Sequence, residues 1–86
     1  MNDKKISSHD ISEYLLNFFL KSHPTETIDF DENFYHQGLI DSFSIIELIE
    51  SLESEFNIQF SQQDFMDEKF PTIRGLSEII HDKIQQ

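Results

Sequence analysis

The sequence has no cysteine, and only two glycines and two prolines among its 86 residues. Without cysteine there can be no disulfide framework and no thiolate metal site. So few turn-forming residues argue against a turn-rich β-sandwich and favour helices joined by a few loops. The length corresponds to one domain. We therefore expect a single domain over residues 1–86, with residues 1–7 as a flexible tail.

Basic residues are scarce as well: 6 Lys and Arg stand against 17 Asp and Glu, which gives a formal net charge of −11. Such a balance excludes a protein that binds nucleic-acid phosphates or docks onto an anionic membrane. The apolar runs are too short to span a bilayer, and none follows the N-terminus as a secretory signal would. These absences predict a cytoplasmic protein with no nucleic-acid partner and no stable membrane insertion.

The negative charge is concentrated in the middle of the chain. The window from Asp29 to Glu68 contains eleven acids and no Lys or Arg, whereas the rest of the chain is neutral overall. An acidic run is most often a solvated face that keeps a protein soluble. It can also steer basic partners toward the molecule. Composition alone leaves both interpretations open.

Apolar side chains recur at helical spacing near the N-terminus. This pattern predicts a first helix over residues 8–22 with one apolar stripe. We expect Asp10 with Glu13 to start this helix and His23-Pro24 to stop it. The stripe consists of Ile11, Tyr14, Leu15, Phe18 and Phe19.

A second helix is predicted over residues 42–56 by the same spacing. Asp41 is a suitable N-cap, and Asn57 can adopt the left-handed conformation that ends a helix. The apolar stripe of this helix consists of Ile45, Leu48, Ile49, Leu52 and Phe56.

Two further helices are predicted in the C-terminal third. A short one follows Ser61, with Asp64 closing a capping box. The last one starts after Thr72, and Gly75 inside it would cost about 1 kcal/mol relative to Ala and weaken its first turn. The apolar faces are Phe65 and Met66 in the short helix, and Ile73, Leu76, Ile79, Ile80 and Ile84 in the last.

About eighteen residues, His23–Ile40, separate the first two helices. Loops of this length are uncommon in compact domains and are often functional. The predicted fold is therefore all-α, a four-helix bundle of three longer helices and one short helix with a long first loop. The apolar residues expected to pin that loop to the core are Ile28, Phe30, Phe34, Leu39 and Ile40.

Two candidate sites fail on the residues they require. The run Asp29–Asn33 inside the long loop resembles the opening of a calcium loop, but the chain has Phe34 and Ile40 at the positions where such a loop needs Gly and Glu. A catalytic set of Ser42, His36 and Asp41 would also need a pocket and an oxyanion site, for which so small a domain has little room. The four histidines do not pair at helical ligand spacing. We therefore predict neither a metal site nor an enzyme.

Ser42 is placed where the second helix is predicted to begin, beside Asp41. The backbone N–H groups at that end are unpaired and the helix dipole is positive, so a phosphate ester on an exposed hydroxyl would be favoured by about 0.3–1 kcal/mol. The primary hydroxyl of serine is unhindered and can enter the active site of another enzyme. Serine is also a common helix-start residue, so its position alone does not establish a function.

The run Phe34–Phe43 (FYHQGLIDSF) resembles the phosphopantetheine attachment site of acyl carrier proteins and peptidyl carrier domains. The family pattern is an aromatic residue or Leu, then Gly, then Asp-Ser-Leu at the head of an acidic helix. The resemblance continues through Glu47-Leu48 and residues 52–58. It reaches Thr72-Ile73 and the last helix, so it covers about residues 8–84. The family fold is a four-helix bundle, in agreement with the pattern above.

The resemblance implies that a phosphopantetheinyl transferase moves a 4'-phosphopantetheine arm from coenzyme A onto Ser42. The arm would carry acyl or aminoacyl intermediates as thioesters and present them to partner enzymes at high effective concentration. These partners would be a loading enzyme, such as an adenylating ligase, and a downstream synthase or transferase. The carrier would act as a monomer and catalyse nothing itself. The alternative is an unmodified acidic interaction module that binds a basic partner.

The resemblance also assigns partner recognition to the second helix and its start. The acids there would steer docking, which should be quick and salt-sensitive. The replacement of the usual Leu by Phe43 departs from housekeeping fatty-acid carriers, and the run Gly38–Phe43 is closer to D-alanyl carrier proteins and free-standing carriers of specialised pathways. The cargo stays open among an amino acid, a short acyl group and a polyketide unit. The predicted recognition residues are Asp41, Phe43, Ile46, Glu47, Glu50 and Glu53.

Overall fold

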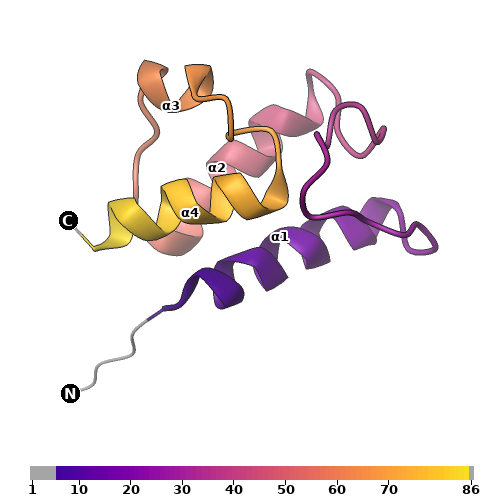
Figure 1. Cartoon of the computed structure of the whole chain (residues 1–86), viewed down its shortest axis with the longest axis horizontal. Coiled ribbons are helices and arrows are strands. Elements are labelled where there is room, and N and C mark those ends of the chain that lie inside the picture. Colours follow the sequence, from indigo (N-terminus) through magenta and orange to yellow (C-terminus); the bar gives the residue numbers. More distant parts are fainter. Residues whose placement is uncertain (1–5, 86) are drawn as a thin grey trace.

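The computed structural model describes residues 6–85, which contain four helices and no strand. The helices are α1 (Ser8–Ser22), α2 (Ser44–Phe56), α3 (Gln62–Met66) and α4 (Ile73–Ile84). Figure 1 shows α1 running alongside α4, α2 lying behind α4, and the short α3 set across the opposite side from α1. The predicted all-α bundle of three longer helices and one short helix is confirmed. The predicted tail at residues 1–5 lies outside the described residues.

Helix α1 has the predicted range, but its capping residues differ from the prediction. Ser7 and Asp10 form the capping box: Asp10 N–H donates to Ser7 Oγ (3.1 Å), and Ser7 N–H donates to Asp10 Oδ2 (3.0 Å). These hydrogen bonds lower the pKa of Asp10 below its ordinary value. The expected start signal of Asp10 with Glu13 was therefore wrong by one turn. Residues 6 and 7 are also not part of a tail, because Ile6 packs against the core.

The core is built from all the longer helices and from the long loop. Phe34 is completely buried, and its N–H donates to the Pro71 carbonyl (2.7 Å) just before α4. Arg74 N–H donates to the Phe30 carbonyl (3.0 Å), so the loop is joined to the start of α4 at two points. Full burial of one such aromatic side chain contributes about 1.5–3 kcal/mol. The buried hydrophobic residues are Ile11, Leu15, Phe19, Phe34, Leu39, Ile40, Leu48, Leu52, Phe70, Ile73, Leu76, Ile79 and Ile80.

The structure explains why a glycine stands at position 75 inside α4, which the sequence alone did not indicate. It is buried, and a Cβ at this position would lie 2.0 Å from the Lys69 carbonyl oxygen. The first turn of α4 is also capped, since Gly75 N–H donates to Thr72 Oγ1 (2.9 Å). The glycine thus permits a close approach between α4 and the turn before it. The expectation of a weakened first turn is corrected accordingly.

The short α3 is capped as predicted, but its apolar face is not buried. Ser61 N–H donates to Asp64 Oδ2 (2.7 Å) and Asp64 N–H donates to Ser61 Oγ (3.3 Å). Met66 is 75% exposed, and Phe65 is 48% exposed although its ring lies against Phe60 and Phe70. The small apolar face predicted for Phe65 and Met66 is therefore largely exposed to solvent.

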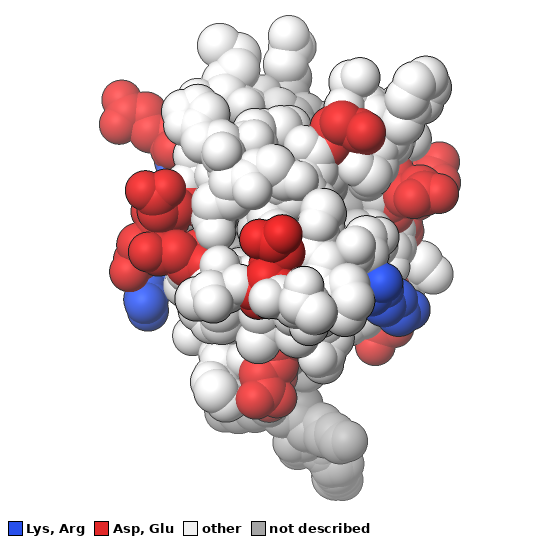
Figure 2. Space-filling view, turned by 90° about the vertical axis from the view of Figure 1, so that its right-hand side faces the viewer, with Lys and Arg blue, Asp and Glu red and all other residues white. Residues whose placement is uncertain are grey.

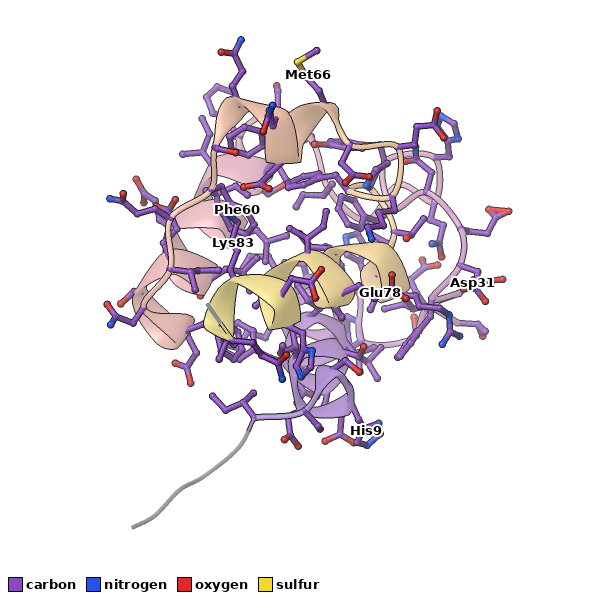
Figure 3. The ribbon with its side chains drawn as sticks, turned by 60° about the vertical axis from the view of Figure 1, so that its left-hand side comes forward. His9, Asp31, Phe60, Met66, Glu78 and Lys83 are labelled. Atoms are coloured by element: carbon purple, nitrogen blue, oxygen red, sulfur yellow. The ribbon has the colours of Figure 1, made fainter. Side chains whose placement is uncertain are left out.

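A half-buried ion pair joins α3 to α4. Lys83 Nζ lies 2.7 Å from Asp64 Oδ2, and the two side chains are 21% and 18% exposed. Lys83 also lies over the Phe60 ring, 5.8 Å from its centre, as Figure 3 shows. Partial burial favours the neutral acid, but the hydrogen bonds from Lys83 and Ser61 outweigh it and hold the pKa of Asp64 below its ordinary value.

Candidate functional site

The turn from Asp41 to Ser44 leads the long loop into α2. Asp41 Oδ1 accepts the N–H groups of Phe43 (3.0 Å) and Ser44 (2.9 Å) and the Ser44 hydroxyl (2.9 Å). In return, Asp41 N–H donates to Ser44 Oγ (2.9 Å). These hydrogen bonds from Ser44 and Phe43 lower the pKa of Asp41. Asp41 therefore caps the entry to the helix as predicted, although the regular α2 begins at Ser44, two residues later than expected.

Ser42 lies inside this turn rather than at the first position of the regular helix. It is exposed, and its hydroxyl makes no hydrogen bond with any residue that the structure describes. The backbone beside it is nevertheless fixed, because Ile45 N–H already donates to the Asp41 carbonyl (3.0 Å) in helical fashion. The arrangement offers an accessible hydroxyl on a rigid backbone.

The loop before the turn explains why Ser42 is held at this point. Leu39 and Ile40 are buried, only 6% and 7% exposed. The His23 ring, at the end of α1, donates from Nε2 to the Leu39 carbonyl (3.1 Å). Gly38 has φ of 76°, a left-handed conformation that suits glycine and turns the chain into this anchor. Ser42 therefore lies only two positions after the buried pair Leu39 and Ile40.

Most of the predicted recognition residues lie exposed beside Ser42. Phe43 is 82% exposed and Ile46 is 56% exposed, while Glu47 and Glu50 are exposed on α2. Figure 2 looks at this end of the molecule and shows acidic side chains distributed around it, with basic side chains only at the margins.

Glu53 differs from the other predicted recognition acids. It is half-buried, and its Oε2 accepts the Phe60 N–H (2.9 Å) from the segment between α2 and α3. Its carboxylate therefore holds that segment in place. Asn57 ends the helix in the left-handed conformation (φ 55°), as predicted.

Three exposed apolar side chains near this face were not predicted as functional residues. Tyr35 is 41% exposed on the long loop, and Phe65 and Met66 are exposed on α3. The sequence predicted only that Phe65 and Met66 form a small apolar face, and nothing in it marked them as a contact surface. Exposed aromatic and Met side chains are typical of protein contact surfaces.

The residues considered above for a metal site or a catalytic set make other contacts in the structure. Within residues 6–85, no group of three or more His, Asp or Glu side chains could hold a metal ion. Asp31, from the calcium-like run, pairs with Arg74 instead. The Asp41 carboxylate is engaged with Phe43 and Ser44, so it does not orient His36.

None of the helices among the described residues has the length and apolar character needed to cross a membrane.

The described residues thus form a small helical bundle with an exposed serine in a capped turn at the head of an acidic helix. The family model for the phosphopantetheine attachment site matches residues 19–80. The chain belongs to this family of carrier proteins.

Comparison with individual proteins indicates the type of carrier within this family. The chain is 34% identical over 77 residues to a D-alanyl carrier protein of Streptococcus suis (strain 98HAH33), covering 84% of the chain and 98% of that relative. It is 43% identical over 42 residues to a D-alanyl carrier protein of Leuconostoc citreum (strain KM20), covering 49% of the chain and 54% of that relative. No solved structure matches the chain significantly. The protein is therefore similar to carriers of the D-alanyl type.

Membership in this family establishes the function in general terms. The protein is a carrier, not an enzyme, and its cofactor is 4'-phosphopantetheine. When bound, that group supplies a thiol on which acyl groups are held as thioesters. Carriers of this family interact with a modifying transferase and with loading enzymes. The alternative of an unmodified acidic interaction module is not favoured.

Proposed function

We propose that Ser42 is the residue that bears the phosphopantetheine arm, and that the cargo is an amino acid of the D-alanyl type. The observation that supports the attachment most directly is the exposed, unpaired Ser42 hydroxyl inside the Asp41–Ser44 turn. The nearby serine, Ser44, is a poor acceptor because its hydroxyl is already hydrogen-bonded to Asp41.

The residues around Ser42 position the hydroxyl and need not activate it. The side chain of Asp41 holds the turn and the buried Leu39 and Ile40 anchor the chain before it. No general base contacts Ser42 among the described residues, so proton removal and transfer fall to the modifying transferase. This division of labour fits a protein whose chemistry is supplied by its partners.

The cargo is proposed from the relatives named as D-alanyl carrier proteins, one of which is matched over 98% of its length. An amino acid reaches a thiol most directly through an adenylating ligase, because the acyl adenylate provides the activated carbonyl. We therefore propose such a ligase as the loading partner and a transferase as the acceptor of the cargo. The competing possibilities are a fatty acyl or a polyketide cargo.

Partner docking is proposed on the face formed by Phe43, Ile46, Glu47 and Glu50. Its exposed apolar side chains lie between acids, which suits a partner with an apolar centre and a basic rim. Glu53 contributes by fixing the segment after α2 rather than as a free charge. We propose that the chain acts as a single, monomeric domain in the cytoplasm, where coenzyme A is available.

The attachment is tested by incubating the protein with coenzyme A, magnesium and a broad-specificity phosphopantetheinyl transferase, followed by intact mass measurement. Wild type should gain one phosphopantetheine group and Ser42→Ala should gain none. Ser54→Ala, which removes an exposed serine further along α2, is the matched control and should be modified like wild type. Modification of Ser42→Ala would refute the assignment.

The cargo is tested on the modified protein with ATP and a D-alanine-adenylating enzyme, in parallel with a fatty acyl ligase and its substrate. A thioester should form with the amino acid and be released by hydroxylamine. Loading of the fatty acid with no loading of the amino acid would overturn the cargo proposal while leaving the attachment intact.

A further inference from the structure

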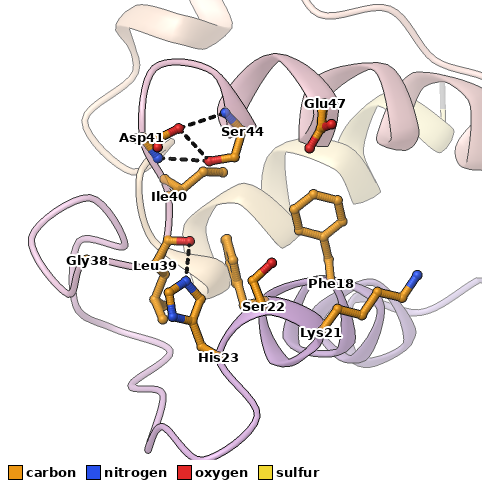
Figure 4. Close-up of a pocket in the computed structure, with 11 residues that line it drawn as sticks. Phe18, Lys21, Ser22, His23, Gly38, Leu39, Ile40, Asp41, Ser44 and Glu47 are labelled. Carbon is orange, nitrogen blue, oxygen red and sulfur yellow. Dashed lines mark hydrogen bonds between the residues drawn. The ribbon is translucent and has the colours of Figure 1, made fainter.

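His23 follows the last residue of α1 and is held in place by its own backbone. Its N–H donates to the Phe19 carbonyl (2.9 Å), and its carbonyl accepts the Glu26 N–H (3.2 Å). The ring is half-buried and reaches the Leu39 carbonyl, as Figure 4 shows. Because a carbonyl oxygen can only accept, Nε2 of the ring is the donor. His23 therefore places a fixed donor from the end of α1 against a residue sixteen positions further along the chain.

This hydrogen bond reaches the segment that leads into the Ser42 turn. Among the described residues, the other hydrogen bonds of residues 35–43 stay within the long loop or the start of α2. Leu39 N–H, for example, donates to the Phe34 carbonyl (3.0 Å) in the same loop. The bond from His23 is therefore the one that joins this segment to a different helix.

Burial and hydrogen bonding fix different properties of the chain before Ser42. Leu39 and Ile40 are held in the core by their apolar side chains. Hydrophobic contacts are non-directional, so they leave the peptide plane between these two residues able to rotate about the adjoining backbone dihedrals. The hydrogen bond from His23 fixes the direction of that plane, since the Leu39 carbonyl has to point at the ring. The plane in turn sets the direction in which the chain continues to Asp41.

The Ser42 turn is held on its two sides by bonds of different reach. On the α2 side, the Asp41–Ser44 hydrogen bonds give the turn its shape. They join residues three positions apart, so they do not connect the turn to any other helix. On the loop side, only two residues stand between the Leu39 carbonyl and Ser42. A change in the direction of that carbonyl therefore changes the position of the Ser42 hydroxyl.

We propose that His23 is a positioning residue for phosphopantetheine transfer, because its ring holds the Leu39 carbonyl in the direction that presents the Ser42 hydroxyl to the modifying transferase. This inference rests on the proposed attachment at Ser42. Misplacing a reacting group by about 1 Å can cost about 100-fold in rate. The function of His23 is thus to limit the positions that the hydroxyl can adopt.

His23 takes no part in the bond-making step itself. In that step the Ser42 oxygen bonds to the coenzyme A phosphorus that carries the pantetheine, and the pyrophosphate bond breaks. The adenosine bisphosphate leaves with the electron pair of that bond, and the hydroxyl proton passes to the transferase. His23 acts on this reaction only through the backbone between Leu39 and Ser42.

The matched pair His23→Gln and His23→Met tests the role of the hydrogen bond. The two side chains have nearly the same length, but only Gln keeps an N–H donor at its end. Transfer is followed by intact mass with limiting transferase, at a temperature where circular dichroism shows each variant fully folded. At saturating carrier, kcat should fall by about tenfold in His23→Met, with little change in KM, because the hydroxyl is misplaced after binding. His23→Gln should recover most of that loss.

Two further variants separate this role from a general loss of stability. His23→Asn keeps an amide but is one methylene group shorter than Gln, so it does not reach the Leu39 carbonyl and should be as slow as His23→Met. His36→Met changes an exposed histidine of the same loop and should keep the kcat and KM of the wild type. If His23→Met is not fully folded, the comparison of His23→Gln with His23→Asn decides the same question.

Nuclear magnetic resonance gives a readout that does not depend on the transferase. The carbonyl carbon resonance of Leu39 should shift upfield in His23→Met, as the carbonyl loses its donor, and return toward its wild-type position in His23→Gln. An unshifted resonance in His23→Met would show that the hydrogen bond is not formed in solution, and would overturn the proposal.

The failure of this proposal can be told apart from the failure of the attachment. A wild-type kcat in His23→Met, or equally low values in His23→Met and His23→Gln, would overturn the positioning role and leave the attachment at Ser42 intact. Peptide mapping of the modified wild type is done before the rates are compared. A phosphopantetheine group on another residue, or no group at all, would overturn both proposals.

Discussion

The two capped turns of this protein use the same hydrogen-bond pattern in opposite surroundings. Asp41 and Ser44 pair at the entry to α2, and Ser61 and Asp64 pair with the order of acid and serine reversed. Asp41 is exposed and has no cationic partner in the described structure, whereas Asp64 is half-buried against Lys83. The first turn is held locally and presents a free hydroxyl, while the second fixes α3 to α4 by a contact distant in sequence.

The comparison shows how a chain with few bases distributes them. The three ion pairs with Lys or Arg among the described residues all join to α4, through Glu78, Arg74 or Lys83. The start of α2 receives none of them, so Glu47 and Glu50 stay available to basic partners. The cations support the structure on one side of the bundle and leave the charge of the other side uncompensated.

The largest expected effect comes from the loop core that supports the Ser42 turn. Phe34→Ala should reduce the free energy of unfolding by about 3–5 kcal/mol, because it opens a cavity at a fully buried site. Phe34→Leu removes less volume and should cost less than Phe34→Ala. Urea unfolding followed by fluorescence or circular dichroism measures both.

Because Phe34→Ala is expected to remove much of the stability of the fold, the effect on the Ser42 turn is measured in Phe34→Leu. Amide hydrogen exchange at Leu39 and Ile40 should be faster in this variant than in wild type, if the loop core holds the turn in place. Unchanged exchange there, with a measurable loss of stability, would show that the turn is independent of the loop core.

The next effect concerns the second turn. Lys83→Met removes the charge but keeps the apolar stem, and should destabilise the fold by about 1–2 kcal/mol at neutral pH because Asp64 loses its partner while half-buried. Lys69→Met, which breaks a more exposed pair with Glu78, is the control and should change stability by about 0–0.5 kcal/mol. Equal losses of stability in the two variants would contradict a larger contribution from the partly buried Lys83–Asp64 pair.

The same pair predicts a pH dependence. The folded pKa of Asp64 is depressed, so its stabilisation is present above the ordinary Asp pKa and is lost as the pH falls through the folded value. The difference in unfolding free energy between wild type and Lys83→Met should therefore shrink below about pH 4. A difference that is constant from pH 7 to pH 3 would contradict this assignment.

A smaller effect on stability is expected at the first turn. Asp41→Ala removes the acceptor for Phe43 and Ser44, so the melting temperature should fall less than in Lys83→Met. The rate of phosphopantetheine transfer should fall clearly, because Ser42 is no longer held. Asp41→Asn keeps a capping oxygen and should restore much of the rate. If both variants receive the phosphopantetheine group at the wild-type rate, the Asp41 hydrogen bonds are not needed to hold Ser42 for the transferase.

The smallest effect on stability is expected for the surface acids. Reversing Glu47 and Glu50 to Lys should change the unfolding free energy by no more than about 0.5 kcal/mol, since both are exposed. Association with a loading enzyme should slow by about tenfold at low salt and lose much of its salt dependence. Stopped-flow association rates at several salt concentrations measure this. Unchanged rates would exclude steering by these two acids.

Local signals in the sequence predicted the helices well. The range of α1, the Ser61–Asp64 capping box, the left-handed Asn57 and the start of α4 after Thr72 were all confirmed. Each depends on residues a few positions apart, whose preferences are largely intrinsic.

What the sequence did not reveal depends on contacts between distant segments. The need for Gly75 comes from the Lys69 carbonyl, and the engagement of Glu53 comes from Phe60 N–H after the helix has ended. The cap of α1 was assigned to Asp10 instead of Ser7, because Asp10 lies three residues after Ser7 and three residues before Glu13.

Site mapping of the modified protein tests the central claim most directly. Protein purified from its native cells, or modified with coenzyme A and transferase, would be digested and its peptides fragmented to locate the pantetheine group. The account predicts one phosphopantetheine per chain on the Ser42 oxygen. A group on another residue, or a Ser42 that stays unmodified in both preparations, would contradict it.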